Sequence, residues 1–172
     1  HSATYETTGR DGLSLSEHWV DGMCSLHGTH VAGFPNLFIV GLNQGANLIS
    51  NVTHNLTEAA TSIAAVVAHA LTIGALEVEA TAEAEQAWVA QFESSTRGFL
   101  GNPDCTPGYY NNEGAEPTPA QRLNASGYPD GPVAFFALID RWRTSGSFDG
   151  LAFRAPGSAP LGGGATTAHE PG

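Results

Sequence analysis

The chain has 172 residues, of which 6 are basic and 17 acidic, so charged side chains make up 13% of the sequence and the formal net charge is −11. About 25% is ordinary for a soluble domain, so either much of the surface is normally covered or the chain is a piece of a larger protein. Every basic residue is Arg. So few basic groups exclude a nucleic-acid-binding surface and an anionic membrane as partners.

The start of the chain carries weak strand and helix signals. Tyr5–Thr8 is β-prone and ends in Gly9–Gly12, which predicts a turn. Ser14 or Ser16 is placed to cap a short helix before Asp21. The chain shows no signal-peptide pattern, and its two cysteines fit reduced thiols, so we expect a cytoplasmic protein.

The middle of the chain predicts a strand, a loop and a long helix. Leu37–Leu42 is continuously apolar and predicts a strand buried on both faces, as in a covered parallel sheet. The loop Gly41–Asn51 is rich in Gly, Asn and Ser. From Thr53 to Ile73 apolar residues recur every three or four positions, which predicts one helix. The stripe consists of Leu56, Ala59, Ala60, Ile63, Val66, Val67, Ala70 and Leu71.

The ends of this long helix have their own signals. Asn55 and Glu58 have the spacing of a capping box, Thr53 is an alternative cap, and Gly74 supplies the stop. The uncharged window Ala59–Leu76 approaches the length needed to span a bilayer. Its Ala, Thr, Ser and His content favours a buried helix of a soluble protein.

The second half of the chain predicts two helices around an irregular arm. One helix runs from Ala80 to about Ser94, and the arm Phe99–Gln121 is rich in Pro and Gly. Gly131-Pro132 opens a helix Val133–Ser145, and Ala155–Gly172 is expected to be disordered. In the last helix we expect Phe135, Phe136, Leu138, Ile139 and Trp142 to point inward and Asp140, Arg141 and Arg143 outward.

The usual catalytic and metal motifs do not emerge. Cys24, His27 and His30 have a zinc-like spacing, but a fourth ligand is missing nearby, so we expect no metal. The sequence has no Gly-x-Ser-x-Gly elbow and no Gly-x-Gly-x-x-Gly after a strand. We therefore assign no catalytic residue and no dinucleotide fingerprint to this chain.

The loop Gly41–Asn51 is the best candidate for a binding site. It offers flexible backbone, neutral amide side chains, and a helix N-terminus with free N–H groups. An uncharged heterocycle with carbonyl groups, or one that becomes anionic on reduction, would suit it. From the pattern alone, an ordinary helix entry loop explains these residues equally well.

Several short patterns in a fixed order resemble a known family. They are Gly9-Arg10-Asp11-Gly12-Leu13, Leu15-Ser16-Glu17-His18-Trp19, Gly33-Phe34-Pro35-Asn36-Leu37-Phe38, Ser50-Asn51, Glu83-Ala84-Glu85-Gln86-Ala87-Trp88-Val89, Cys105-Thr106-Pro107-Gly108-Tyr109-Tyr110-Asn111-Asn112-Glu113-Gly114, Phe135-Phe136 and Trp142-Arg143. Over about His1 to Phe153 the sequence resembles the C-terminal part of a Baeyer-Villiger type flavin monooxygenase.

This resemblance implies an α/β fold class. The chain would be the end of a three-layer, Rossmann-like FAD/NAD(P)-binding fold, an incomplete domain with an irregular helical extension. Residues 1–75 would end the FAD-binding domain, 76–154 would form a C-terminal extension with the Pro/Gly-rich arm, and 155–172 would be a disordered tail. Leu37–Leu42 would be the last strand of the FAD domain.

The implied activity uses FAD and NADPH to insert one oxygen atom of O2 into a ketone, or to oxidise a heteroatom, through a flavin C4a-peroxide. Because both glycine fingerprints are missing, we expect the isolated chain to bind FAD weakly or not at all and to lack activity. Its implied partners are the missing N-terminal FAD and NADPH domains. Two alternatives stay open, namely a non-catalytic α/β partner-binding module and a flavin-dependent NADPH oxidoreductase that is not a monooxygenase.

The expected site residues lie in the loop and the first helical turn. Those expected to bind the cofactor are Gly41, Asn43, Gln44, Asn51 and Val52, of which the resemblance puts the last three beside the isoalloxazine. Those that the resemblance turns toward the substrate cavity are Leu48 and Ile49.

Overall fold

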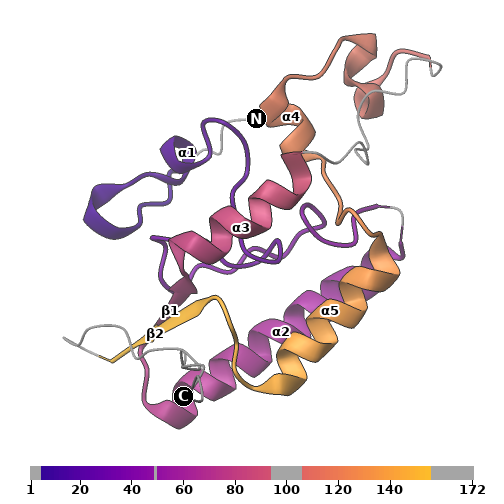
Figure 1. The fold of residues 1–172 in the computed structure, drawn as a ribbon. Helices are drawn as coiled ribbons and strands as arrows, with labels where there is room; N and C mark the ends of the chain where they lie inside the picture. Colours follow the sequence, from indigo (N-terminus) through magenta and orange to yellow (C-terminus); the bar gives the residue numbers. More distant parts are fainter. Residues whose placement is uncertain (1–4, 49, 94–105, 156–172) are drawn as a thin grey trace, which may run out of the picture.

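The computed structural model describes residues 5–48, 50–93 and 106–155 (Figure 1). Most of the expected disordered tail and part of the arm lie outside these residues, as does Ile49. In chain order the elements are η1 (Arg10–Gly12), α1 (Leu15–His18), α2 (Val52–Ile73), β1 (Glu77–Ala80), α3 (Ala82–Glu93), η2 (Tyr109–Gly114), α4 (Pro119–Asn124), α5 (Pro132–Ser145) and β2 (Leu151–Arg154).

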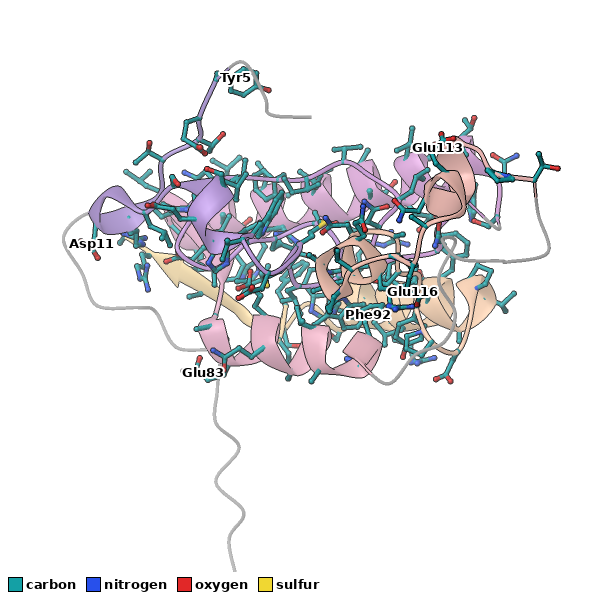
Figure 2. The ribbon with its side chains drawn as sticks, turned by 90° about the horizontal axis from the view of Figure 1, so that it is seen from above. Tyr5, Asp11, Glu83, Phe92, Glu113 and Glu116 are labelled. Carbon is teal, nitrogen blue, oxygen red and sulfur yellow. The ribbon has the colours of Figure 1, made fainter. Side chains whose placement is uncertain are left out.

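Three helices, α2, α3 and α5, make up most of the regular structure in the described residues. Helices α2 and α5 lie side by side, α3 lies apart from this pair, and the β1–β2 ribbon closes one end (Figure 1). The irregular stretch 20–48 runs between α3 and the α2–α5 pair in this view. Viewed from above, Asp11 lies at one end of the molecule and Glu113 lies toward the other (Figure 2). The buried core combines side chains of α2, α3 and α5 with side chains of the irregular stretch 20–48.

The short N-terminal elements agree with their sequence signals. Thr8 pairs with Ser14 across the turn that contains η1. The Ser14 side chain accepts a hydrogen bond from the Glu17 backbone N–H, and the Glu17 side chain accepts one from the Ser14 backbone, which makes a capping box. The prediction of a Ser-capped helix before Asp21 is confirmed.

Helix α2 begins at a different cap from the two predicted. The side chain of Asn51 accepts from the His54 N–H at 3.0 Å, so Asn51 is the N-cap rather than Asn55 or Thr53. Asn55 is buried and its side chain turns back toward the preceding loop. Gly74 ends the helix in the left-handed conformation, as predicted.

The predicted strand Leu37–Leu42 is wrong. Within the described residues this run is irregular, and its one ladder contact is a bridge between Phe38 and His30. The Ile39 N–H donates to the Thr29 carbonyl at 2.8 Å. A strand needs a neighbouring strand to pair its backbone, and here the adjacent backbone is the tight turn 26–30.

The observed strands are short and charged, and sequence analysis missed both. β1 and β2 pair antiparallel, with Glu77 opposite Arg154 and Glu79 opposite Ala152. On its other edge, β1 forms a parallel bridge between Ala32 and Ala80. The core therefore combines residues from both sides of the predicted domain boundary at 75/76.

The ribbon is held by ion pairs around one buried carboxylate. Glu79 has a side chain that is 4% exposed and pairs with Arg154 and, at 2.9 Å, with Nε of Arg10. Arg10 also pairs with Glu77. These carboxylates raise the pKa of Arg10. The N-terminal turn is thereby fastened to the sheet.

Helices α3 and α5 fall close to their predicted ranges. Trp88 and Phe92 of α3 are buried, and Phe135 and Ile139 of α5 are buried against them in one aromatic-rich cluster. Trp88 stacks on Tyr128 with ring centroids 5.4 Å apart. The burial of Phe135 and Ile139 confirms the apolar face predicted for α5.

Two predictions for the second half need correction. Arg143 does not point outward, since its Nη1 pairs with the Glu58 carboxylate of α2 at 3.0 Å. Both side chains are largely buried between α2 and α5, where an unpaired charge would be costly. The end of the supposedly irregular arm is helical, since Thr118 caps α4 in a capping box with Gln121.

Helix α2 has one packed and one exposed face. Its buried positions are Asn55, Ser62, Val66 and Ala70. Its exposed apolar side chains are Val52, Leu56, Val67, Leu71 and Ile73, at 41, 37, 39, 73 and 40% exposure. By length and composition alone α2 could cross a membrane, which is weak evidence because core helices pass the same criterion.

The ion pairs of Glu79 lead to a stability prediction. Replacing Glu79 by Gln leaves two guanidinium groups beside a neutral amide, so we expect a loss of about 3 kcal/mol in the free energy of unfolding. Urea unfolding of the 172-residue chain measures it. The matched control is Glu116→Gln, whose pair with Arg122 is exposed and whose loss should cost less than about 1 kcal/mol. Equal losses for the two variants would contradict the role given to Glu79.

Candidate functional site

The loop 41–51 presents most of its predicted site residues to solvent. Gly41, Asn43, Asn51 and Val52 are exposed, and Leu48 is 40% exposed. Asn51 and Val52 begin α2, and Gly41 and Asn43 line a small cavity together with Asn55 of that helix. The exposed side chains are open to a ligand or to another protein segment.

Gln44 is the exception, because it is fully buried. Its Oε1 accepts from Ser25 Oγ at 2.5 Å, and its Nε2 donates to the Met23 carbonyl. Its backbone N–H donates to the Ser126 carbonyl at 2.8 Å, and its carbonyl accepts from Trp88 Nε1 at 3.3 Å. With its amide bonded internally, Gln44 holds the loop in place, and its side chain is buried away from any ligand at the surface.

The N-terminus of α2 offers hydrogen-bond donors. Asn51 caps the His54 N–H, and the Asn55 N–H donates to the Asn51 carbonyl. Within the described part of the chain, the N–H groups of Val52 and Thr53 have no acceptor. Two donors and the positive end of a 22-residue helix therefore face outward at this point.

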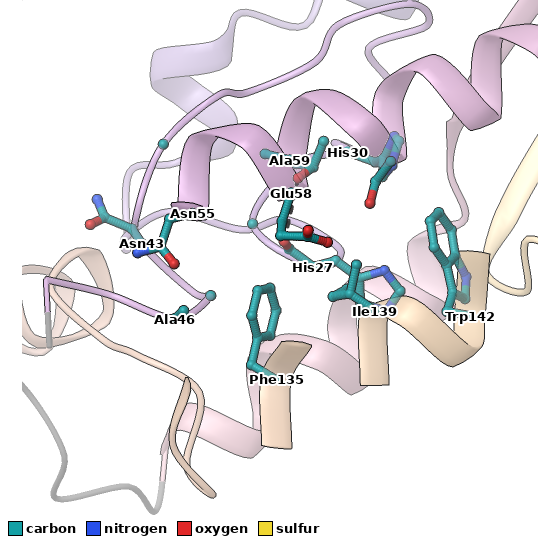
Figure 3. A pocket seen from close by; sticks show the side chains of 15 residues that line it. His27, His30, Asn43, Ala46, Asn55, Glu58, Ala59, Phe135, Ile139 and Trp142 are labelled. Atoms are coloured by element: carbon teal, nitrogen blue, oxygen red, sulfur yellow. Dashed lines mark hydrogen bonds between the residues drawn. The ribbon is translucent and has the colours of Figure 1, made fainter. Parts of the chain in front are cut away.

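A small cavity lies behind the loop, between α2 and α5. Phe135, Ile139 and Trp142 of α5 face Glu58 and Ala59 of α2 across it (Figure 3). Its volume of about 30 Å³ has room for only one or two water molecules. A flavin or a polycyclic substrate does not fit inside, so a ligand of that size has to lie on the surface of this chain.

Two histidines line this cavity from the 26–30 turn. The His27 ring packs edge-on against Trp88 and Trp142, and His30 packs against Phe38 and Trp142. The Nδ1 atoms of both rings are buried without a partner among the described residues. Burial lowers the pKa of His27 to about 3, with a further contribution from His30, and lowers that of His30 to about 4.

Glycines let the turn approach the loop closely. A Cβ on Gly28, whose φ is +72°, would lie 2.5 Å from the Asn43 carbonyl oxygen. A Cβ on Gly45 would lie 3.1 Å from the Phe135 ring. Only glycine fits at Gly28, because both its conformation and the space are unavailable to a side chain.

The zinc-like spacing of Cys24, His27 and His30 does not form a metal cluster. Among the described residues no three His, Cys, Asp or Glu side chains are placed to hold a metal ion. Burial raises the pKa of the Cys24 thiol, which disfavours the thiolate that a metal or an electrophile needs. The two histidines instead serve as aromatic packing around Trp142.

The side chains of His18 and Glu85 form a polar pair away from the loop. Glu85 accepts from the Ala32 N–H at 2.9 Å and contacts His18 Nε2 at 2.9 Å. Burial is the main cause that raises the pKa of Glu85. This pair ties α1 to α3 and lies in neither the cavity nor the loop.

Sequence analysis missed the residues that organise the loop from behind. Asn47 is buried with a φ of +56°, and Asn55 was interpreted as a cap. The sequence offers no local signal for this role, because Asn47 precedes the helix and the exposed Asn51 is the same residue type as the buried Asn47 and Asn55.

Comparison with known proteins gives close matches over most of the chain. The Baeyer-Villiger monooxygenase of Streptomyces coelicolor is 41% identical over 157 residues, which are 90% of this chain and 25% of that protein. An FAD-binding monooxygenase of Hypomyces subiculosus is 38% identical over 149 residues, 86% of this chain and 24% of that protein. No family profile matches the chain.

A solved structure gives the same result. The polycyclic ketone monooxygenase from the fungus Thermothelomyces thermophila superposes with a TM-score of 0.72 at 30% identity, covering 87% of this chain and 24% of that one. The chain is thus a C-terminal segment of a flavin-dependent monooxygenase, and it spans about a quarter of the length of the relatives it matches. Within that class it belongs to the Baeyer-Villiger type, which confirms the resemblance seen in the sequence.

The two histidines predict how stability depends on pH. An unfolded histidine has a pKa near 6.5, so below that pH the unfolded chain binds protons that the folded chain excludes. The free energy of unfolding should therefore fall from pH 6.5 to about 4, by about 1.4 kcal/mol per pH unit for each histidine. Urea unfolding at several pH values measures this slope.

His30→Phe should remove about one histidine's share of that slope, because a phenyl ring can keep the contacts with Phe38 and Trp142. The control is Thr57→Ala, an exposed position of α2 without a titratable group, which should leave the slope unchanged. An unaltered slope in His30→Phe would show that His30 is not held neutral by burial.

Proposed function

We propose that this chain supplies one wall of the flavin site in an FAD- and NADPH-dependent monooxygenase that inserts an oxygen atom of O2 into a ketone or oxidises a heteroatom. The observation that carries the proposal is the exposed N-terminus of α2, with its two free N–H groups beside the loop 41–51. The similarity of the chain to monooxygenases over 86–90% of its length supports the proposal.

The residues present fit a flavin edge. Bound FAD would supply oxygen activation, with NADPH as the source of electrons. The N–H groups of Val52 and Thr53 can donate to the carbonyl edge of a flavin pyrimidine ring. The helix dipole favours negative charge there, without reorganisation of the protein.

The exposed side chains of the loop have separate parts in this proposal. We assign Asn43 and Asn51 to polar contacts with the cofactor, and Gly41 to close approach of the backbone. Gln44 would act by holding the loop rather than by touching the ligand. Leu48, 40% exposed, would face the substrate, as would Ile49, which lies outside the described residues.

The exposed face of α2 is the proposed contact with the rest of such an enzyme. Three quarters of each relative lies outside the match, and both glycine fingerprints belong to that part by the family resemblance. Val67 and Leu71 would pack against the missing FAD-binding domain and complete its three-layer, Rossmann-like fold. A cytoplasmic location and the absence of membrane and nucleic-acid partners remain part of the proposal.

The alternatives have less support. A non-catalytic binding module would not require a helix N-terminus with unused donors beside exposed amides. An NADPH oxidoreductase without monooxygenase activity is not favoured, because the matched proteins are named as monooxygenases.

A chimera tests the function. This chain replaces the matching C-terminal segment of the Streptomyces coelicolor Baeyer-Villiger monooxygenase, its 41% identical relative. We expect the chimera to bind FAD and to couple NADPH oxidation to ketone-dependent oxygen uptake. The relative truncated before the segment is the control and should do neither. The chain alone should bind FAD weakly or not at all, since it lacks a phosphate-binding turn.

Two results would count against the proposal. A folded chimera that binds FAD but oxidises NADPH without any ketone dependence would favour the oxidoreductase alternative. Stoichiometric FAD on the isolated 172-residue chain would show that this chain forms a complete flavin site by itself.

The exposed face of α2 gives a further prediction. The isolated chain should self-associate and bind an apolar dye such as ANS, because a contiguous apolar face is open. Leu71→Gln should reduce both signals. Val20→Gln is the matched control, since Val20 has the same 73% exposure but lies outside α2. Equal reductions in both variants would contradict a specific role for the α2 face.

A further inference from the structure

A buried carboxamide joins α2 to the loop that precedes it. Asn55 is in the second turn of α2 and is 6% exposed. Its Nδ2 donates to the Asn47 carbonyl at 2.8 Å, and its Oδ1 accepts from Ser50 Oγ at 2.8 Å. One side chain therefore holds two points of the loop, eight and five residues back along the chain.

The first of these points is itself fixed. Asn47 has a φ of +56°, an unusual conformation that the surroundings enforce. Its Nδ2 donates to the Ala125 carbonyl at 3.0 Å, and its Oδ1 accepts from the Leu48 N–H at 2.5 Å. A Cβ on Gly127 would lie 2.7 Å from the Asn47 Cβ, so the 125–127 backbone packs directly on it.

The part of the loop between these anchors carries the exposed residues. Leu48 follows Asn47 directly, and Asn51 and Val52 follow Ser50. Their side chains are exposed, so few contacts of their own fix them. Their arrangement therefore depends on the hydrogen bonds beneath them, and those converge on Asn55.

We propose that Asn55 is a positioning residue, which holds Asn47 and Ser50 against the N-terminus of α2 and so sets where the loop presents Leu48, Asn51 and Val52 to a bound flavin and its substrate. This inference rests on the proposed function for the identity of the ligand. Misplacement by about 1 Å is enough to weaken a preorganised site, which gives a buried residue without ligand contact a measurable effect.

Amide hydrogen exchange in the 172-residue chain tests the lock without any flavin. Asn55→Leu keeps the size of the side chain and removes both hydrogen bonds, so the Leu48 amide should exchange about tenfold faster or more. Ser50→Ala removes one bond and should give a smaller acceleration. The control is Ser62→Ala, a buried polar position two turns further along α2, whose hydroxyl accepts a hydrogen bond from Arg143 at 3.5 Å.

The same variants in the chimera test the positioning role. FAD affinity should fall by about tenfold in Asn55→Leu and stay near the parent value in Ser62→Ala, and the absorbance spectrum of the bound flavin should shift only in Asn55→Leu. Equal exchange rates in Asn55→Leu and Ser62→Ala would overturn the lock. Faster exchange with unchanged FAD affinity and spectrum would overturn the positioning role.

A failure of the proposed function would look different. In that case the parent chimera would not bind FAD, whereas the exchange rates would still decide whether Asn55 locks the loop.

Discussion

The hydrogen bonds of Gln44 are the constraint on which the arrangement of the site depends. This residue joins the 23–25 turn, α3 and the backbone at Ser126, segments far apart in the sequence. A buried carboxamide is costly unless every polar atom is paired, and Gln44 meets that condition. It can therefore hold a left-handed φ of +54° in a loop with little regular structure. The position of the adjoining residues follows from this anchor, and Asn55 fixes the part of the loop next to α2.

The two faces of α2 show how the segment divides its contacts. One face packs against α5, where Glu58 and Arg143 form a half-buried ion pair beside the small cavity. The opposite face keeps Val67 and Leu71 in water. A free-standing domain of this size would ordinarily cover such a face, since apolar burial is its main source of stability. The proposed contact with other domains would also account for the low charge content, because a covered surface needs fewer charged groups.

Sequence reasoning succeeded where local rules decide the structure. The apolar repeat and Gly74 predict α2 to within one residue, and Gly131-Pro132 predicts the start of α5. It failed where contacts between distant segments determine the structure. Leu37–Leu42 has the composition of a buried strand, but a strand exists only where other backbone pairs with it. The strands that do form are four residues long, and β1 contains Glu79, whose buried carboxylate is paired with arginines from distant positions in the sequence.

The difference between local and long-range signals also explains which features of the candidate site could be predicted. Sequence and resemblance identified the loop and the helix N-terminus, because glycines, amides and caps are local signals. They could not distinguish the amides that face outward from those that hold the loop together. Asn43 and Asn51 are exposed, whereas Gln44, Asn47 and Asn55 are buried, although all five are amides within 13 residues. Exposed amides can adapt to a ligand, and buried ones determine where the exposed ones lie. The proposed stabilisation of a flavin edge without reorganisation would need both kinds, so in that proposal the buried amides matter as much as the residues that touch the ligand.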